Sequence, residues 1–305
     1  MRGARPQREV EASIERSGVF AQGEHVLVAC SGGADSIALA AALHAVAARL
    51  HLALRLAHVN HALRSSAWQD ECVVLDLAAR LGLPLDIVAL PEVAGDEESL
   101  RVARYAALVE SARRNGCSVV ATAHHAQDQS ETVLLALLRG TGPAGLSGIA
   151  PRRALEPGVD LARPLLRVAP DALRAYCHAK ALPYAVDPTN ADSSKRRNAV
   201  REALETLRPI FPGLDRAVAR AAETIAAEQA GDRRAQLRRS VRERFADDSD
   251  LRDVDFAHVE AAVRALEGGA TGTYLMKPGI SLRIERGSMR GIITERLPRH
   301  TSSIR

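Results

Sequence analysis

One stretch decides the fold, and it reads Cys30-Ser31-Gly32-Gly33-Ala34-Asp35-Ser36. The short apolar run before it, residues 25–30, is rich in valine and is typical of a buried strand. The run after it, residues 37–50, is rich in alanine and leucine without glycine or proline, and predicts a helix. A strand, a glycine turn and a helix form a phosphate site, because paired glycines let the backbone approach an anion and the first N–H groups of the helix face it.

The turn differs from two common phosphate-binding motifs. A Walker loop requires G-x-x-x-x-G-K-[ST], and no lysine lies near this turn. The dinucleotide fingerprint G-x-G-x-x-G is absent from the turn too. Residues 140–145 match that fingerprint, but they follow a predicted helix instead of a strand, and we interpret them as a flexible loop. The alternative interpretation of residues 31–36 is a glycine-rich turn that binds no ligand.

Strands and helices alternate through the first two thirds of the chain. Beyond the first pair, strands are predicted at 52–59, 85–90 and 117–122. Helices are predicted at 68–81 and 97–115, and a further one follows the polar stretch 124–129 and ends at 139. This alternation favours an α/β fold with a doubly wound parallel sheet. Ligands of such sheets bind outside the carboxyl ends of the strands. The polar stretches 31–36, 58–64 and 124–128 all follow predicted strands, so we expect them to converge on one site.

A second, smaller domain is expected after residue 212, where Pro209 and Pro212-Gly213 interrupt the chain. The predicted domains are residues 1–212, which contain the phosphate loop, and residues 213–305. The second would hold a long helix at 214–245, a helix from Asp255 to Glu267 and a small antiparallel sheet. Residues 193–245 carry thirteen Arg and Lys against seven Asp and Glu, which favours a polyanionic partner.

The composition is that of an ordinary globular protein. The 305 residues are 47% hydrophobic and 26% charged, with a net charge of +4. No apolar run reaches membrane-spanning length and no signal-type segment opens the chain, so we expect a cytoplasmic protein with no membrane partner. The four cysteines form no C-x-x-C pair, which argues against a zinc site or a disulfide framework.

The loop Ser-Gly-Gly-x-Asp-Ser resembles the pyrophosphate-binding loop of the ATP pyrophosphatase (PP-loop) superfamily. Seven later motifs narrow the resemblance, and they are listed here in chain order: His58-Val59-Asn60-His61-Ala62-Leu63-Arg64; Arg101-Val102-Ala103-Arg104-Tyr105; His124-His125-Ala126-Gln127-Asp128-Gln129-Ser130-Glu131-Thr132; Arg139-Gly140-Thr141-Gly142; Arg163-Pro164-Leu165-Leu166; Asp187-Pro188-Thr189-Asn190; and Arg197-Asn198-x-x-Arg201. Together they resemble the tRNA(Ile)-lysidine synthetases, densely over residues 20–215 and more loosely beyond.

The resemblance implies an adenine-nucleotide α-hydrolase-like fold and a ligase that uses ATP and Mg²⁺. Residues 1–212 would then form the ATP-binding catalytic domain and residues 213–305 a tRNA-binding domain. Such enzymes use ATP to activate C2 of the wobble cytidine in an isoleucine tRNA with a CAU anticodon, through an adenylated cytidine. The amine of free lysine then displaces AMP and leaves lysidine, with pyrophosphate as the other product. A carbonyl oxygen is a poor leaving group and an adenylate a good one, so activation precedes amine attack. A homodimer is one assembly that the resemblance allows.

The resemblance also assigns roles to residues. The implied ATP-binding residues are Ser31, Gly32, Gly33, Ala34, Asp35, Ser36, His58 and Asn60; the catalytic ones are Asp35, Arg104, His124, Asp128 and Arg197; the tRNA-binding ones are Arg196, Arg197, Asn198 and Arg201. Asp35 and Asp128 are the candidate magnesium ligands, and an alternative role for Asp128 is to hold the lysine ammonium.

The sequence departs from the family pattern in places. Gln127 stands where many relatives have Asp, so the metal role stays on Asp128 alone. Ala62 replaces a common Gly, and we expect the chain to lack the second C-terminal domain of longer relatives.

Three other functions remain as alternatives. A tRNA thiolation enzyme of the same superfamily would carry C-x-x-C pairs or a paired catalytic cysteine, which this chain lacks. An NAD or GMP synthetase would lack the Arg-Asn-x-x-Arg stretch and the basic tail. A non-catalytic RNA-binding module with a vestigial nucleotide fold would not be expected to keep Asp35, His124 and Asp128 together.

Overall fold

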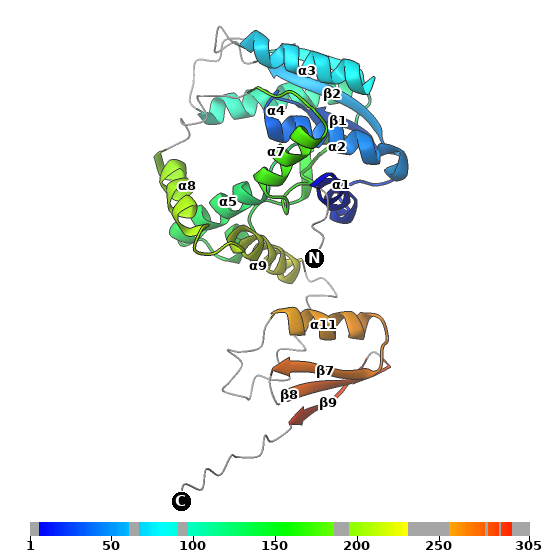
Figure 1. Cartoon of the computed structure of the whole chain (residues 1–305), viewed down its shortest axis with the longest axis vertical. Coiled ribbons are helices and arrows are strands. Elements are labelled where there is room, and N and C mark those ends of the chain that lie inside the picture. The colour runs from blue at the N-terminus through cyan, green and yellow to red at the C-terminus, as the bar shows by residue number, and fades with distance from the viewer. Residues whose placement is uncertain are drawn as a thin grey trace, which may run out of the picture. The chain divides into compact units, whose positions relative to one another are not determined.

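The computed structural model describes residues 6–60, 67–90, 97–185, 195–230, 256–277, 280–286 and 288–294. The chain divides into two compact units, Met1–Glu223 and Thr224–Arg305, which are described separately here. Figure 1 shows the chain and labels many of its elements.

The division between the units falls inside helix α9 (Leu214–Gln229), later than the boundary expected after residue 212. The first half of α9 is held to the first unit by ion pairs. Arg208 Nε lies 3.0 Å from Asp215 Oδ2, and Arg167 Nε lies 2.6 Å from Glu223 Oε1. Proline and glycine mark a turn at residues 209–213, but these contacts keep the helix that follows with the first unit. The remainder of the helix predicted at 214–245 lies outside the described residues, as does Asp255.

The first unit is built on a six-stranded sheet with the order β3-β2-β1-β4-β6-β5. Its strands are β1 (His25–Ala29), β2 (Ala53–Asn60), β3 (Leu85–Ala89), β4 (Val119–Ala121), β5 (Arg152–Glu156) and β6 (Val159–Ala162). Every neighbouring pair is parallel except β5 and β6, which form an antiparallel pair at one edge. The predicted doubly wound α/β fold is therefore confirmed. The chain order reverses between β1 and β4, the switch point at which such sheets bind ligands.

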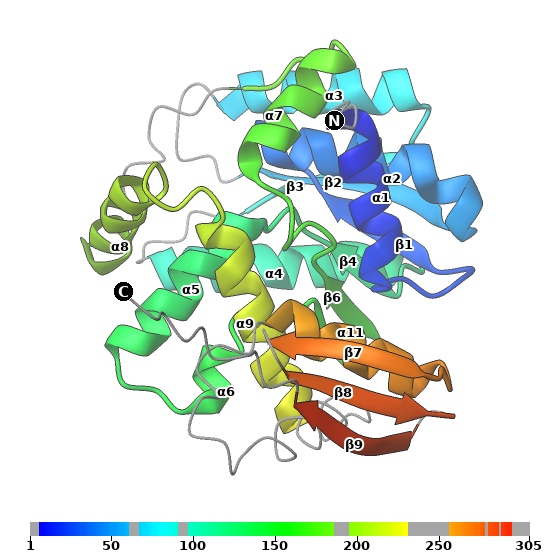
Figure 2. The same ribbon diagram turned by 60° about the horizontal axis from the view of Figure 1, so that its bottom comes forward.

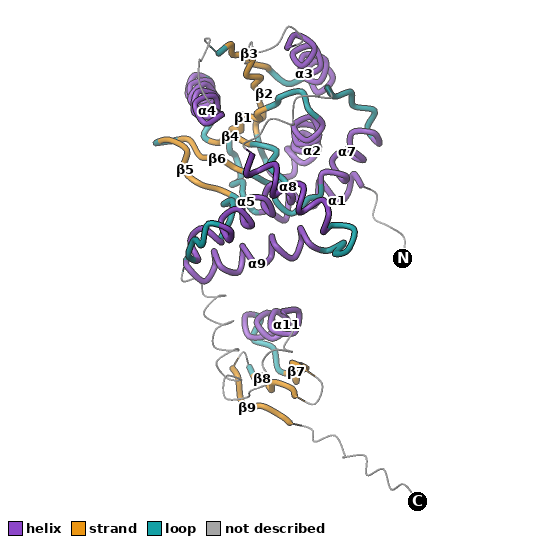
Figure 3. Tube along the Cα trace, turned by 90° about the vertical axis from the view of Figure 1, so that its left-hand side faces the viewer, coloured by secondary structure: helices purple, strands orange, loops and turns teal. Residues whose placement is uncertain are grey.

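Helices cover both faces of this sheet. The covering helices are α1 (Pro6–Ser17), α2 (Ala34–Leu50), α3 (Ala67–Leu81) and α7 (Pro170–Ala179) on one face and α4 (Glu97–Arg114) on the other. The alternation of side chains along β1 explains the two layers, because Val26 and Val28 pack with α2 and α7 whereas Leu27 packs with α4. Figure 3 shows α4 on one side of the strands and α2 with α7 on the other.

Three further helices extend from the sheet near its switch point. They are α5 (Ala126–Leu138), α6 (Pro143–Leu146) and α8 (Lys195–Leu207), and α5 packs against both others. The G-x-G-x-x-G match at 140–145 follows α5, as predicted, but its residues 143–145 belong to α6, so only part of the predicted loop is a loop.

The second unit contains α11 (Phe256–Glu267) and an antiparallel sheet of β7 (Gly272–Lys277), β8 (Ile280–Glu285) and β9 (Ser288–Thr294), in the order β7-β8-β9. Val259, Val263 and Leu266 repeat at helical spacing and are buried with Leu282 and Ile284, which alternate along β8. Figure 2 shows the three strands in order beside α11. The predicted small antiparallel sheet is confirmed. Among the described residues, no helix combines the length and the apolar character that a membrane crossing requires.

Candidate functional site

A cavity of about 850 Å³ opens at the carboxyl ends of β1, β2 and β4. Of the site residues predicted from the sequence, it is lined by Ser31, Gly33, Ala34, Asp35, Ser36, His58, Asn60, Arg104, His124, Asp128 and Arg201. The structure thus brings together the three polar clusters that follow the strands. Gly32, Arg196, Arg197 and Asn198 are not among the residues that line the cavity.

The loop between β1 and α2 is closed by its own hydroxyl groups. Ser36 Oγ accepts a hydrogen bond from the Ser31 N–H at 3.1 Å and donates one to the Gly33 carbonyl at 2.9 Å. Gly33 is the N-cap of α2 and has no side chain to bond the first N–H groups of the helix. These groups lack intrahelical acceptors, so they are available to an anion in the cavity.

Gly32 is required by two features of its position. Its φ of +93° lies in the left-handed region, and a Cβ atom there would meet the Asp70 carbonyl oxygen at 3.1 Å and the Asp70 Cα at 3.2 Å. Helix α3, which contains Asp70, therefore packs closely against the phosphate loop at Gly32.

An imidazole lies between two carboxylates at the centre of the cavity. His125 Nε2 is 3.6 Å from Asp35 Oδ2, and His125 Nδ1 is 3.3 Å from Asp128 Oδ2. Asp128 is anchored at the start of α5, where its Oδ2 accepts the His125 backbone N–H at 2.8 Å. Burial raises the pKa of Asp35 above its ordinary value, and the charge of Asp128 adds to this effect while that of His125 opposes it.

The two carboxylates offer oxygen ligands to a hard cation. Asp35 Oδ1 is buried and has no hydrogen-bond partner. No group of three or more His, Cys, Asp or Glu suited to a metal assembles within the described part of the chain. The donor set therefore fits a cation such as Mg²⁺ that takes most of its ligands from phosphate oxygens and water.

Burial lowers the pKa of His124 to about 4. The charge of Asp128 opposes this shift and the charges of Arg163 and Arg104 add to it, so the neutral imidazole is favoured at physiological pH. Thr122 Oγ1 lies 2.9 Å from His124 Nδ1 and orients the ring. A neutral imidazole in this position can hydrogen-bond to a substrate without adding charge to the cavity.

His58 and Asn60 line the cavity from the end of β2. His58 is buried, and its Nδ1 lies 2.9 Å from the Cys30 carbonyl oxygen. A carbonyl only accepts, so Nδ1 carries the proton and Nε2 is left as an acceptor. Asn60 Nδ2 donates to Glu71 Oε2 on α3 at 3.2 Å.

Arg201 and Arg197 both approach one buried carboxylate, Glu131 of α5, which is 4% exposed. Arg201 Nε lies 2.8 Å from Glu131 Oε1, and Arg197 Nε lies 3.5 Å from Glu131 Oε2. These ion pairs hold α8 against α5. Arg196 is exposed on the same helix, and the assignment of the α8 residues to tRNA binding stays a prediction.

The cavity wall also contains side chains for which the sequence predicted no role, among them Asp70, Tyr105, His125, Glu131, Arg174 and Tyr184. His125 lies within one of the motifs that carry the resemblance. It directly precedes α5 and stands three residues before Asp128, and this spacing is the signal that could have identified it. Arg174 and Tyr184 lie in segments without a motif, and only the packing of α7 brings them to the cavity. Two motif segments, 61–64 and 187–190, lie outside the described residues.

Comparisons with known proteins agree with this geometry. The model of the PP-loop domain family matches residues 5–207. A tRNA(Ile)-lysidine synthase from Streptomyces coelicolor is 38% identical over 283 residues, which cover 91% of this chain and 74% of that protein.

Two further proteins extend the comparison. The tRNA(Ile)-lysidine synthase of Salinispora tropica is 44% identical over 211 residues, or 67% of this chain, and the chain spans 63% of that relative's length. The solved structure of U34-tRNA thiolase NcsA from Methanococcus maripaludis, with its [4Fe-4S] cluster, superimposes with a TM-score of 0.62 over 72% of this chain and 78% of that one. At 18% identity, this likeness concerns the fold alone. Because it matches the PP-loop domain family and is 38% identical to the Streptomyces coelicolor protein over 74% of that protein's length, the chain belongs to the tRNA(Ile)-lysidine synthase family.

Proposed function

We propose that this protein joins lysine to C2 of the wobble cytidine of an isoleucine tRNA with a CAU anticodon. The reaction consumes ATP, passes through an adenylated cytidine and releases AMP and pyrophosphate. The observation that carries the proposal is the grouping of Asp35, His125 and Asp128 beside the phosphate loop, in a chain of this family. The protein would act in the cytoplasm, where tRNA is modified.

The reaction has two steps. In the first, the cytidine O2 attacks the α-phosphorus of ATP, a P–O bond forms, and the bond to the β-phosphate breaks to release pyrophosphate. In the second, the lysine amine attacks C2, a C–N bond forms, and the C–O bond breaks to release AMP. The amine loses a proton in this step.

The residues of the cavity would divide this work. The N–H groups at the start of α2 and the Ser31 and Ser36 hydroxyls would hold the pyrophosphate part of ATP. Arg104 and the neutral His124 would donate hydrogen bonds to the charge that develops at the α-phosphate. His58 Nε2 offers an acceptor to the nucleoside.

Asp35 and Asp128 would hold Mg²⁺, which, when bound, neutralises charge on the phosphates and favours departure of pyrophosphate. The buried, unpartnered Oδ1 of Asp35 supports that role. For Asp128, holding the lysine ammonium is the alternative.

A lysine-transfer assay tests the proposal. The full chain is incubated with ATP, Mg²⁺, radiolabelled lysine and an unmodified CAU-anticodon isoleucine tRNA transcript. We expect ATP-dependent label on the RNA, and Asp35→Asn should reduce the rate by about a hundredfold or more, since it removes a charge at the reacting phosphates. Asp70→Asn, another acid of the cavity wall outside the carboxylate pair, is the matched control.

Two other outcomes would overturn the proposal. Sulfur incorporation in place of lysine would assign the protein to tRNA thiolation. The cysteines near the loop argue against that reaction, because burial raises the pKa of Cys30 to about 11 and that of Cys177 to about 12, which keeps both thiols protonated. Tight tRNA binding without either product would indicate a binding module. Sedimentation of the same preparation would show whether the protein forms the homodimer that the resemblance allows.

A further inference from the structure

The phosphate loop supplies hydrogen bonds but no cation of its own. In Walker-type loops a lysine reaches the β- and γ-phosphates and offsets their charge. The three lysines of this chain are Lys180, Lys195 and Lys277, and none of them belongs to the loop. A cationic side chain for a polyphosphate bound here therefore comes from another element.

Three arginines line the cavity in the described part of the chain, Arg104, Arg174 and Arg201. Arg201 is engaged by the buried Glu131. The Arg104 guanidinium lies 5.6 Å from the centre of the Tyr105 ring, and its charge acts on His124, the residue assigned to the α-phosphate end. Arg174 instead lies on α7, the helix that packs against α2 at the phosphate loop, and its side chain lines the cavity together with Ser31, Gly33 and Asp35.

The packing of α7 holds Arg174 in register with the loop. Cys177 follows Arg174 by three residues, so the two share a face of the helix, and Cys177 Sγ donates to the Ala34 carbonyl at 3.4 Å. Beyond the helix, the Ala185 N–H donates to the Gly32 carbonyl at 2.9 Å. The segment that carries Arg174 is thus hydrogen-bonded to the loop at two carbonyls, those of Gly32 and Ala34.

Arg174 can exchange its present partner. It is paired with Asp171, one helical turn earlier, and the side chains of Arg174 and Asp171 are 49% and 86% exposed. Exposed pairs of this kind contribute little to stability, whereas a guanidinium binds phosphate through two parallel hydrogen bonds.

We propose that Arg174 is the cation that binds the β- and γ-phosphates of ATP and the pyrophosphate that leaves. The inference rests on the proposed function for its ligand and adds a residue from outside the family motifs. Arg174 does the work of the lysine in a Walker loop, but from the helix that packs against the loop.

Binding measurements on the full chain test this assignment. Arg174→Gln should weaken the binding of ATP and of pyrophosphate by about tenfold or more, since a charged phosphate contact is lost. The binding of AMP, which lacks these phosphates, should change by less than about twofold. Arg174→Lys keeps the charge and should restore part of the loss. Equilibrium dialysis with labelled ATP and AMP, and competition by pyrophosphate, measure these constants.

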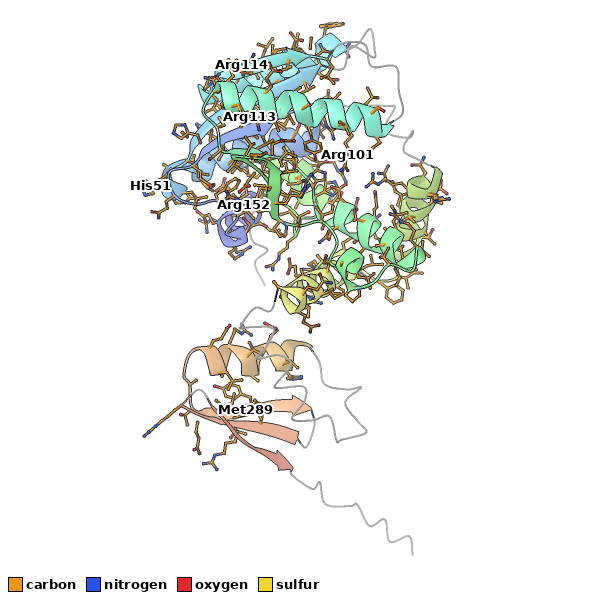
Figure 4. All side chains as sticks on the ribbon, turned by 180° about the vertical axis from the view of Figure 1, so that it is seen from behind. His51, Arg101, Arg113, Arg114, Arg152 and Met289 are labelled. Carbon is orange, nitrogen blue, oxygen red and sulfur yellow. The ribbon has the colours of Figure 1, made fainter. Side chains whose placement is uncertain are left out.

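The matched control is Arg113→Gln. Arg113 lies on α4 (Figure 4), its side chain is 53% exposed, and it pairs with Glu156 at 3.9 Å without lining the cavity. The control should bind ATP, pyrophosphate and AMP like the parent protein.

The outcomes separate this inference from the proposed function. Arg174→Gln that binds ATP as tightly as the parent would overturn the inference, as would an equal loss of AMP and ATP affinity. A parent protein that binds ATP and transfers no lysine would overturn the proposed function alone. Comparing ATP binding by the parent and by Arg174→Gln would then still test the role of Arg174. A parent that binds no ATP would overturn both.

Discussion

At the scale of the residue, Gly32 shows how an absent side chain shapes the phosphate loop. Gly32→Ala should destabilise the protein and weaken ATP binding, because the left-handed backbone costs roughly 1–2 kcal/mol and the new Cβ would also press on the Asp70 backbone. Thermal unfolding and ATP dialysis measure both effects. Gly23→Ala is the matched control, since its φ is +81° and nothing lies within 4 Å of the added Cβ. Equal losses in the two variants would show that the contact with Asp70 has no effect.

Asp35 is the residue at which function and stability should conflict. Burial raises its folded-state pKa, so the fold favours the protonated form. The associated stability is fully present below the unfolded-state pKa and is lost as the pH rises through the folded-state pKa. Asp35→Asn should therefore raise the Tm at pH 8 in the absence of Mg²⁺, with a difference that shrinks towards pH 3. Calorimetry across this range measures it, and a lower Tm for the variant at pH 8 would contradict the prediction.

At the scale of the element, one buried carboxylate attaches α8 to the rest of the unit. Glu131→Ala should release α8, since Arg197 and Arg201 lose the group that they share, at a cost of about 1–3 kcal/mol. Hydrogen exchange should accelerate in residues 195–207 more than in β1.

Glu202→Ala provides the control for this prediction, because Glu202 lies on α8 itself and is exposed. Its exchange pattern should match that of the parent. Unchanged exchange of α8 in Glu131→Ala would mean that apolar contacts alone, such as those of the buried Val200 and Leu204, hold the helix.

At the scale of the whole molecule, the candidate site belongs to one unit. Among the residues that the structure describes, those that line the cavity fall between Ala29 and Arg201, inside the unit that ends at Glu223. A fragment of residues 1–230, which retains all of α9, should bind ATP within about twofold of the full chain, because no contact of the cavity is removed. Its lysine transfer should fall by about tenfold or more if residues beyond 230 carry tRNA contacts, since each lost phosphate contact weakens binding.

Two measurements on this fragment check the prediction, ATP dialysis and the lysine-transfer assay at limiting tRNA. Transfer at the full rate would show that the second unit is not needed to hold the RNA. Loss of ATP binding would show that the first unit depends on the second for its fold.

Some elements of the fold were predicted from the sequence and others were not. The parallel strands β1 to β4 were predicted because each is a run of apolar residues next to a clear helix signal. The edge pair β5 and β6 was not, since β6 spans only Val159–Ala162 and its alternation is too short to distinguish from a loop. The two compact units divide inside α9, where Glu223 pairs with Arg167 from a distant part of the chain.

The sequence by itself determined the strand, glycine turn and helix around residues 31–36, the parallel sheet, and the side chains that follow the strands. These features depend on local backbone geometry and on the rule that parallel strands end at one edge. Only the tertiary structure decided that Asp35 lies beside His125, that Glu131 receives two arginines of α8, and that Arg174 lines the cavity. Each of these depends on the approach of helices distant in the chain, which is set by side-chain packing and is invisible to any local pattern.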